Sequence, residues 1–395
     1  MVQLRRVVMI IILSEIFLGI FEPYAFAVPS VSAQSAILIE KNSGRILYSH
    51  NAEQKLPMAS TTKIITAICA IENGNVPLDQ TVEISASAAG VEGSSMYLES
   101  GEKMTLRELL YGLMLSSGND AAVAIAECIS GEAEKFADLM NKKAEEIGAI
   151  NTHFTNPNGL PDENHYSTAH DMAKLTAYAM QNPSFAEIAA TKNFKISGEG
   201  KAYPRVLSNH NKLLNMYEGC IGVKTGFTKA AGRCLVSAAE RGGMSLICVT
   251  LNAPNDWDDH MKMFDYGFDS YTYVKLASKD TPVCTAEVDE ADAGVVPVYP
   301  KEDVYFPLAE GEKYVSEIEM YPELCAPLAK GESVGRISFT IDGKKSGELP
   351  LVSGVDAELA TKYDIERVSA IKNMGARLTE SLKNFFEQWL GIFIM

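Results

Sequence analysis

Apolar residues near the start of the chain form two short runs that predict a β-hairpin, followed by a buried helix. The runs lie at residues 36–39 and 45–48, and the polar sequence KNSG at 41–44 between them is typical of a turn. Apolar residues then recur at helical spacing over residues 61–72. This pattern places Ser60 at the start of a largely buried helix.

The middle of the chain has the apolar spacing of helices, whereas the part after Gly219 has short β-type runs. The turn-rich sequence NPNGLP at 156–161 separates two helical regions. The predicted helices cover 106–148, in more than one segment, about 168–180 and 261–271, and the predicted strands lie at 221–225, 234–240 and 246–251. Helices in the middle with strands at both ends predict an α+β domain, in which one antiparallel sheet is flanked by helices and a helical subdomain.

From about residue 274 to residue 360 the pattern changes to short alternating runs separated by proline, glycine and charged residues. Examples lie at 315–320 and 333–340, and no helix-length periodicity is present. This pattern predicts a small all-β sandwich domain after the α+β domain. A chain of 395 residues is long enough for two such domains.

The last segment, residues 364–395, has apolar residues at three- and four-residue steps and predicts an amphipathic helix. Its terminal apolar run at 389–395 is too short to cross a bilayer core of ~30 Å. The run can lie in the membrane interface, with Trp389 at the level of the headgroups. We therefore interpret the segment as a peripheral membrane anchor, and the alternative is a terminal helix packed on the β domain.

The first residues have the pattern of an export signal. Arg5 and Arg6 precede an apolar run at 7–20, and Ala25 and Ala27 supply the small residues of a cleavage site after Ala27. The alternative is an uncleaved membrane anchor, although the apolar run is short for one. The expected organisation is a signal peptide at 1–27, an α+β domain at 28–273, a β-sandwich domain at 274–362 and an anchoring helix at 363–395.

Composition and charge narrow the classes of partner. The net charge is −16 and no basic stripe is visible, which argues against nucleic acid as a partner. The seven cysteines are irregularly spaced and mostly in apolar stretches, so they predict buried thiols, although export permits one or two bridges. His165 and His170 are five residues apart and do not stack on a helix face, so neither a metal site nor a cofactor is expected.

Three short motifs carry candidate chemistry, and the first is STTK at residues 60–63. A serine hydroxyl is a weak nucleophile at neutral pH and needs a base. Residues three apart on a helix share a face, so the Lys63 amine can reach the Ser60 oxygen. A lysine acts as a base only when neutral, and burial together with a second cation such as Lys224 lowers its pKa. An isolated match would be an ordinary helix start with a solvated lysine, but the apolar residues that follow favour a catalytic pair.

The second motif is SGN at residues 117–119, in a predicted loop between two helices. Such a loop can direct the side chains of Ser117 and Asn119 into a cleft. Ser117 is expected to pass a proton between Lys63 and a leaving amine, and Asn119 to bond Lys63 and a substrate amide. The alternative is that Asn119 or Asp120 caps the helix that follows.

The third motif is KTG at residues 224–226, at the end of a β-type run. Lys224 and Thr225 would attract a carboxylate through charge and a hydroxyl bond. Gly226 would let a substrate backbone approach the strand. The amide of Phe227, together with that of Ser60, would form an oxyanion hole. The alternative is a strand end with a solvated lysine.

In this order the motifs resemble those of the serine acyl-transfer enzymes that react with penicillin, which read SxxK, SxN and KTG. From about Ser35 to the C-terminus, the chain resembles the low-molecular-mass penicillin-binding proteins, the serine-type D-alanyl-D-alanine carboxypeptidases of peptidase family S11. The resemblance includes PMASTTK at 57–63, GVKTGFT at 222–228 and the turn at 156–161. That family has an export signal, a β-lactamase-like catalytic domain, a β-rich second domain and a C-terminal amphipathic membrane helix, and each has a candidate here.

The resemblance implies removal of the terminal D-alanine from peptidoglycan stem pentapeptides, in cell-wall synthesis and remodelling. Ser60 would form the acyl-enzyme, Lys63 would take its proton, and D-alanine would leave with the help of Ser117. β-Lactams would acylate Ser60 and leave slowly. Some members hold the substrate carboxylate with an additional arginine, for which Arg233 is a candidate. The implied location is the outer face of the bacterial cytoplasmic membrane.

Three other activities are alternatives. A class A β-lactamase shares the three motifs, but its deacylating glutamate lies in an ExxLN-like loop that is not found in this sequence. A penicillin-binding sensor or scaffold would be acylated with little turnover, and the intact motifs argue against a dead enzyme. A DD-endopeptidase would cut cross-links instead of trimming stems, a choice that depends on the shape of the pocket.

Overall fold

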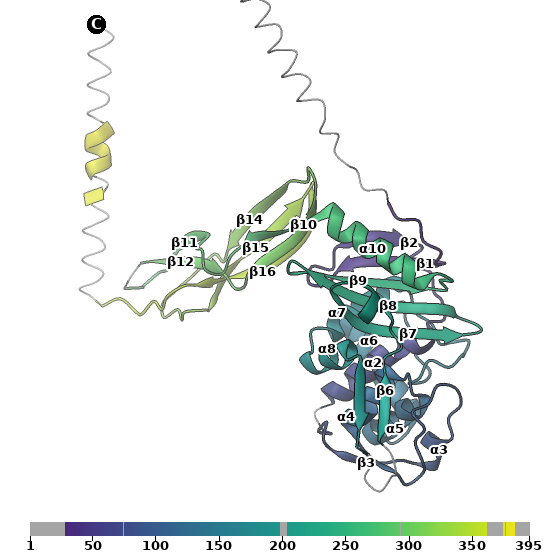
Figure 1. Cartoon of the computed structure of the whole chain (residues 1–395). Coiled ribbons are helices and arrows are strands. Elements are labelled where there is room, and N and C mark those ends of the chain that lie inside the picture. Colours follow the sequence, from purple (N-terminus) through teal and green to yellow (C-terminus); the bar gives the residue numbers. More distant parts are fainter. Residues whose placement is uncertain are drawn as a thin grey trace, which may run out of the picture. The chain divides into compact units, whose positions relative to one another are not determined.

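The chain is described here from a computed structural model over residues 28–73, 75–197, 204–292, 294–361, 374–375 and 377–383. It divides into two compact units, Met1–Thr272 and Tyr273–Met395. Figure 1 shows helices and strands together in the first unit, whereas the regular elements of the second unit up to residue 361 are strands.

The first unit is built on a five-stranded antiparallel sheet with the strand order β2-β1-β9-β8-β7 (Figure 1). Its strands are β1 (Ser35–Glu40), β2 (Ile46–His50), β7 (Cys220–Thr228), β8 (Gly232–Arg241) and β9 (Met244–Leu251). β1 pairs with β9 along its whole length, from Ser35 opposite Leu251 to Glu40 opposite Leu246. The predicted sheet, shared by the first hairpin and the later strands, is therefore confirmed, and β7 lies at one of its edges.

Side chains of the central strands alternate between two covered faces of the sheet. Ile37 and Val249 belong to the apolar core that contains the helical subdomain. On the other face, an added Cβ on Gly267 of α10 (Asp256–Ser270) would come within 2.6 Å of Leu246 and 2.8 Å of Leu38. Every residue of β1 and β9 is buried. Because both faces are covered, these strands appear in the sequence as continuous apolar runs.

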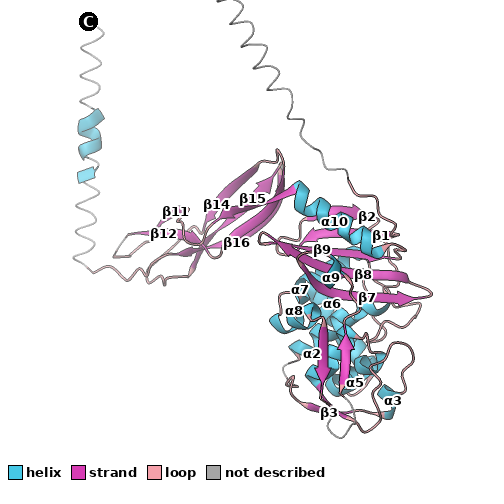
Figure 2. Cartoon of the chain, viewed as in Figure 1, coloured by secondary structure: helices cyan, strands magenta, loops and turns pink. Residues whose placement is uncertain are grey.

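The helical subdomain surrounds α2, whose residues Lys63 to Ala70 are all buried. Figure 2 shows its helices in cyan beside the magenta sheet. They are α2 (Lys63–Glu72), α4 (Leu106–Leu115), α5 (Asn119–Ser130), α6 (Ala133–Ile147), α7 (Ala169–Ala179) and α8 (Pro183–Ala190), with the short η1 (Ala59–Thr62), α3 (Ala86–Ala89) and α9 (Leu213–Met216). The predicted helical regions are confirmed. α10 begins at Asp256, earlier than predicted, because its first turn carries acidic residues, which favour a helix N-terminus but break the apolar pattern.

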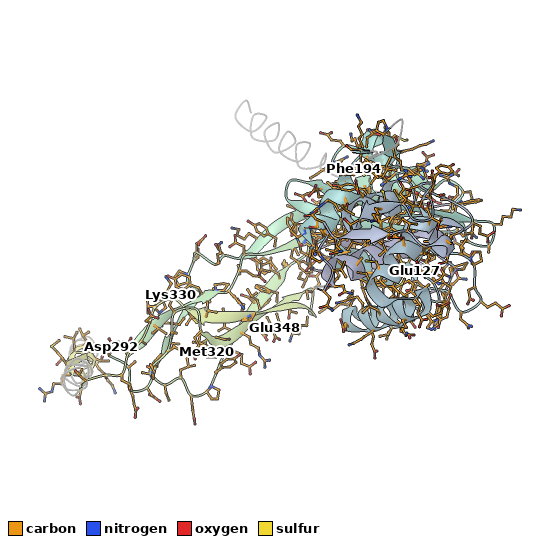
Figure 3. The ribbon with its side chains drawn as sticks, turned by 90° about the horizontal axis from the view of Figure 1, so that it is seen from below. Glu127, Phe194, Asp292, Met320, Lys330 and Glu348 are labelled. Carbon is orange, nitrogen blue, oxygen red and sulfur yellow. The ribbon has the colours of Figure 1, made fainter. Side chains whose placement is uncertain are left out.

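Two small hairpins of the first unit were not predicted from the sequence. β3 (Thr81–Glu83) pairs with β4 (Lys103–Thr105), and β5 (Asn193–Ile196) pairs with β6 (Arg205–Ser208). Strands of three or four residues are too short to show a period of two. Tertiary contacts stabilise the second hairpin, since the ring of Phe194, labelled in Figure 3, stacks on Tyr111 of α4 with the centroids 3.7 Å apart.

The second unit contains a five-stranded sheet with the order β11-β12-β16-β15-β14 and a two-stranded sheet, β10-β13. The strands are β10 (Tyr271–Ala277), β11 (Cys284–Glu287), β12 (Val295–Pro300), β13 (Val304–Ala309), β14 (Tyr314–Met320), β15 (Ser333–Ile341) and β16 (Lys344–Ser353). Val296, Val334 and Leu351 are fully buried in its core. On the surface, Arg336 forms ion pairs with Glu319 and Glu348, the second of which is labelled in Figure 3. The predicted all-β domain is confirmed.

Two predicted segments lie mainly outside the described residues. The proposed signal peptide at 1–27 is outside them altogether. Of the proposed anchor at 363–395, only residues 374–375 and 377–383 are described; they are helical, with Leu378 and Leu382 exposed. Among the described parts of the chain, no helix is both long enough and apolar enough to span a membrane.

Candidate active site

Ser60 lies in the short turn η1, which leads directly into α2, as the sequence predicts. Two threonine hydroxyls hold the turn: Thr61 Oγ1 donates to Met58 O (2.7 Å) and Thr62 Oγ1 donates to Ala59 O (2.8 Å). Thr62 Oγ1 also lies 2.8 Å from His165 Nε2. His165 Nδ1 accepts from a backbone amide, so Nε2 carries the proton and donates to the threonine oxygen.

The amine of Lys63 is fully buried beside the Ser60 hydroxyl. Its Nζ atom donates to Asn119 Oδ1 (2.6 Å) and to the carbonyl oxygen of Asn158 (2.7 Å), which uses both N–H bonds of a neutral amine. The same atom lies 2.9 Å from Ser60 Oγ, so its lone pair can accept the hydroxyl proton. Burial lowers the pKa of Lys63 well below its ordinary value, and the charge of Lys224 lowers it further, against the opposing effect of Asp120. These conditions favour a neutral amine that can accept a proton.

The SGN motif forms the connection between α4 and α5. Ser117 has a φ of +58° and Gly118 is the N-cap of α5, without any side-chain cap bond. Asn119 lies inside the helix, where its Oδ1 accepts from Lys63 and its Nδ2 donates to the carbonyl of Glu92 (2.7 Å). The alternative interpretation, that Asn119 or Asp120 caps the helix, is therefore wrong. The Asn119 side chain is used by Lys63 instead.

The KTG motif lies on the edge strand β7. Lys224 is buried, with 1% of its surface exposed, and its Nζ donates to Thr225 O (2.9 Å). Burial lowers the pKa of Lys224 to about 7. The alternative of a solvated strand-end lysine is therefore wrong.

Gly226 permits close contact between β7 and the turn that carries the serine. An added Cβ would lie 3.0 Å from Met58 O and 3.1 Å from the amide nitrogens of Ser60 and Thr61. From the sequence, we expected Gly226 to allow a substrate backbone to approach the strand. The structure shows that the protein's own turn already requires a glycine here.

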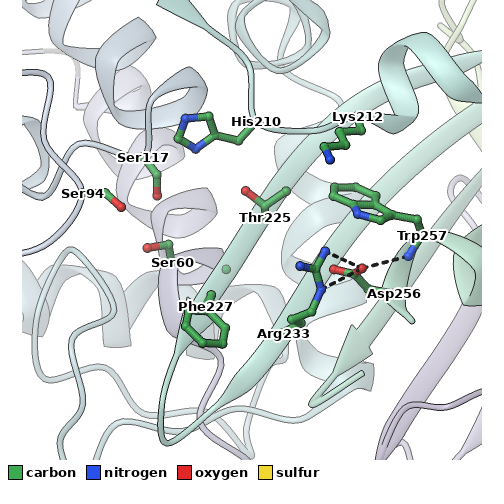
Figure 4. Close-up of a pocket in the computed structure, with 11 residues that line it drawn as sticks. Ser60, Ser94, Ser117, His210, Lys212, Thr225, Phe227, Arg233, Asp256 and Trp257 are labelled. Atoms are coloured by element: carbon green, nitrogen blue, oxygen red, sulfur yellow. Dashed lines mark hydrogen bonds and ion pairs between the residues drawn. The ribbon is translucent and has the colours of Figure 1, made fainter. Parts of the chain in front are cut away.

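The motifs meet at one cavity of about 340 Å³, shown in Figure 4. Ser60 and Ser117 point into one end, and Thr225 lies between them and the other end. The lining residues are Ser60, Ser94, Ser117, His210, Lys212, Thr225, Gly226, Phe227, Arg233, Asp256 and Trp257. The structure thus brings residues of all three motifs to one site, although they are far apart in the sequence.

Arg233 lies at the far end of this cavity, together with Trp257 and Lys212 (Figure 4). Its guanidinium donates to Asp256 Oδ1 from Nε (3.0 Å) and Nη2 (2.7 Å) and lies 5.6 Å from the Trp257 ring. Burial raises the pKa of Asp256, while Arg233 opposes that rise. Two cationic side chains at this end make it the part of the cavity best suited to an anionic group.

Several residues of the site were not singled out from the sequence. Asn158 contributes only its backbone carbonyl, which no residue type signals, although the turn at 156–161 was noticed. His210 and Trp257 belong to no recognisable sequence motif, and only the fold brings them to the cavity. No group of His, Cys, Asp and Glu residues suited to a metal ion is present within the described ranges. All seven cysteines are free thiols.

A serine hydroxyl beside a buried lysine amine, between an antiparallel sheet and a helical subdomain, defines a serine hydrolase of the penicillin-recognising class. A family model described as D-alanyl-D-alanine carboxypeptidase matches residues 23–255, and one described as penicillin-binding protein 5, C-terminal domain, matches residues 271–359. The chain belongs to the D-alanyl-D-alanine carboxypeptidase family.

Similar proteins whose alignments cover most of the chain support this assignment. The chain is 35% identical over 371 residues to D-alanyl-D-alanine carboxypeptidase DacF of Bacillus subtilis (strain 168), covering 88% of this chain and 95% of that one. It is 33% identical to DacC of Escherichia coli (strain K12), over 85% of this chain and 88% of that one. Penicillin binding protein 5 from Haemophilus influenzae has a similar structure, with a TM-score of 0.72, 30% identity, and coverage of 85% of this chain and 100% of that one.

Proposed function

We propose that Ser60 is the acyl-ester nucleophile of this D-alanyl-D-alanine carboxypeptidase and that Lys63 is its base. The observation that carries the proposal is the 2.9 Å contact between Lys63 Nζ and Ser60 Oγ, made by an amine whose burial favours the neutral form. As Ser60 Oγ attacks the carbonyl carbon between the last two D-alanines of a stem peptide, its proton passes to Lys63 Nζ.

The next step is collapse of the tetrahedral intermediate with loss of D-alanine. The leaving nitrogen needs a proton, and Ser117 is suited to relay it because its side chain points into the same cavity as Ser60 (Figure 4). Asn119 holds the Lys63 amine at 2.6 Å and so keeps it aligned with the serine. Water then attacks the acyl-enzyme and releases the shortened stem.

The developing oxyanion needs donors that are already in place. The backbone amides of Ser60 and Phe227 are proposed for this role, since η1 and β7 approach each other closely at Gly226. The terminal carboxylate of the substrate would bind Thr225 and the cations Lys224 and Arg233. A β-lactam, with a carboxylate and a reactive amide, would occupy the same positions and acylate Ser60.

The direct experiment gives the purified protein a stem pentapeptide and, separately, a labelled penicillin. We expect released D-alanine and a covalent label on Ser60, and Ser60→Ala should abolish both. Ser316→Ala, a change in an exposed serine of the second unit, should leave both unchanged. Release of D-alanine by Ser60→Ala would refute the mechanism. A cross-linked stem dimer in the same assay detects endopeptidase activity, and rapid penicillin hydrolysis without D-alanine release would indicate a β-lactamase.

We further propose that residues 1–27 are an export signal, that residues 28–273 and 274–362 are the catalytic and β-sandwich domains, and that residues 363–395 anchor the enzyme to the outer face of the cytoplasmic membrane. The apolar periodicity of the last segment supports the anchor. Deletion of the residues after Asp364 should release the protein from vesicles of anionic and neutral lipid while D-alanine release continues. Continued vesicle binding would place the anchor elsewhere.

A further inference from the structure

Asp120 is a buried carboxylate directly after the SGN motif, to which the proposed mechanism assigns no role. Its side chain lies in the first turn of α5 with no exposed surface. It accepts hydrogen bonds from the segment at 92–98, which we call the cleft loop. Ser95 Oγ donates to Oδ2 (2.6 Å), Met96 N to both oxygens (3.1 Å each) and Leu98 N to Oδ2 (3.1 Å). One carboxylate therefore accepts hydrogen bonds from three donor groups of this loop.

Asn119 forms hydrogen bonds with both the cleft loop and Lys63. Its backbone amide donates to Ser94 O (2.7 Å), and its side-chain Nδ2 donates to Glu92 O (2.7 Å). An added Cβ on Gly93 would lie 2.7 Å from Asn119 Nδ2, so the loop lies tightly against the motif. Ser94 lines the cavity opposite Thr225 (Figure 4). A shift of the cleft loop would therefore alter both the cavity wall and the Asn119 side chain that holds Lys63.

Asp120 also has an electrostatic relation to the reacting groups. Lys63 and Lys224 are two buried amines, and two buried cations close together are unfavourable. Asp120, on α5, opposes the lowering of the Lys63 pKa, whereas Lys224, on β7, contributes to it. Two histidines also lie near these amines: His210, and His165 beside Thr62. Burial lowers the pKa of both rings, so both are neutral at pH 7, and Glu92 of the cleft loop has an exposed side chain. Asp120 thus supplies a negative charge that favours the protonated form of Lys63.

We propose that Asp120 is a positioning residue for the reaction at Ser60, which fixes the cleft loop against the SGN motif and partly balances the charge of the buried Lys63 amine. This inference rests on the proposed roles of Ser60 and Lys63. The N-terminus of α5 favours a negative charge at this position, so a carboxylate is suited to both tasks.

The test measures the second-order rate of acylation by a labelled penicillin from pH 5 to pH 10. Asp120→Asn keeps the shape but removes the charge and places an amide against backbone N–H groups. We expect the maximal rate to fall at least about ten-fold, and the rising limb of the profile to move toward acid by roughly one pH unit, because Lys63 loses the charge that opposes its deprotonation. Ser95→Ala keeps the charge and removes one loop bond, so its rate should fall several-fold with an unshifted limb.

The matched control is Asp171→Asn, another fully buried carboxylate, which binds Asn151 N (2.7 Å) and Thr152 Oγ1 (2.9 Å). It should lower the unfolding temperature without moving the rising limb. An unshifted limb in Asp120→Asn would overturn the electrostatic role, and an unchanged rate in Ser95→Ala would overturn the loop role even if Asp120→Asn does not fold. A positioning residue should slow the labelling reaction and not abolish it. If Asp120→Asn and Ser95→Ala both took up no label at any pH, as expected for Ser60→Ala, the inference would also be contradicted. A Ser60→Ala protein that is still labelled would instead refute the proposed function.

Discussion

The amine of Lys63 lies 2.9 Å from the hydroxyl oxygen of Ser60 while it is fully buried, so the proposed base is held against the proposed nucleophile where its neutral form is favoured. Lys224 is buried as well, and its pKa is lowered to about 7. The two amines have opposite requirements, because Lys63 must be neutral to accept a proton and Lys224 must be charged to attract a carboxylate. The pH dependence of the enzyme should reflect both requirements.

We expect kcat/KM for D-alanine release to fall as pH rises through about 7, where Lys224 loses its proton in the free enzyme. Deprotonation of Lys63, whose pKa burial lowers well below its ordinary value, should give the rising limb of the profile. A bound carboxylate stabilises the charged form of Lys224, so kcat alone should fall at a higher pH than kcat/KM. A pH series of initial rates with a stem pentapeptide measures both. A value of kcat/KM that rises steadily to pH 10 would contradict the assigned role of Lys224.

Replacement of Gly226 by alanine should displace the serine turn. The new Cβ would lie within 3.1 Å of three backbone atoms, one of Met58 before η1 and two within η1. Backbone atoms cannot move aside as the end of a flexible side chain can. We expect acylation by penicillin to slow at least about ten-fold with little loss of secondary structure. The control is Gly347→Ala in β16, where an added Cβ meets nothing within 4 Å. Equal acylation rates in both variants would show that the contact between β7 and η1 does not position Ser60.

Arg233 should contribute to substrate binding and not to the chemical step. We expect Arg233→Ala to raise KM for a stem pentapeptide by about ten-fold with kcat nearly unchanged, because a charge-assisted bond to the terminal carboxylate is lost. A pentapeptide that ends in an amide should bind the variant and the parent equally. Arg336→Ala, in the second unit, removes a surface ion pair and serves as the control. A large fall in kcat with an unchanged KM would contradict this role.

His165 should make the catalytic unit less stable in mild acid. Burial lowers its pKa from 6.5 to about 4, so the folded protein favours the neutral ring. Its contribution to stability is therefore complete above pH 6.5 and is lost progressively as the pH falls from 6.5 to 4, by about 3 kcal/mol in total. Urea unfolding at pH 7 and pH 5 measures this loss. His165→Gln should reduce the difference between the two pH values, and His260, whose pKa burial lowers to about 3, accounts for part of the remainder. An unchanged difference in the variant would contradict the assignment.

The sequence predicted the parts of this enzyme that depend on neighbours along the chain. The buried helix after Ser60 has apolar residues at a period that a single helix imposes, and the i, i+3 spacing alone placed Lys63 beside the serine. The hairpin of β1 and β2 and the strands after Gly219 were recognisable for the same reason. The short hairpins β3–β4 and β5–β6 were not, because tertiary contacts and not periodicity stabilise them.

Some properties of the candidate site could not be predicted from neighbouring residues along the chain. Residue types and motif order identified Ser60, Lys63 and the KTG strand, but a side chain's environment depends on residues far away in the sequence. Only the fold shows that Lys224 is buried and that Asn119 holds Lys63 instead of capping a helix. Only the fold brings the Asn158 carbonyl to the base.

The chain by itself thus predicted the serine, the lysine and the strand to which we assign the site, because a helix period and a three-residue spacing are local properties. The tertiary structure decided how the site works. Burial sets the pKa values of the two amines, and packing around Gly226 sets the distance between the serine turn and β7. Asp120 is bonded to a loop that precedes it by more than twenty residues. Dielectric environment and close contact arise only when distant segments meet, so these properties depend on the fold.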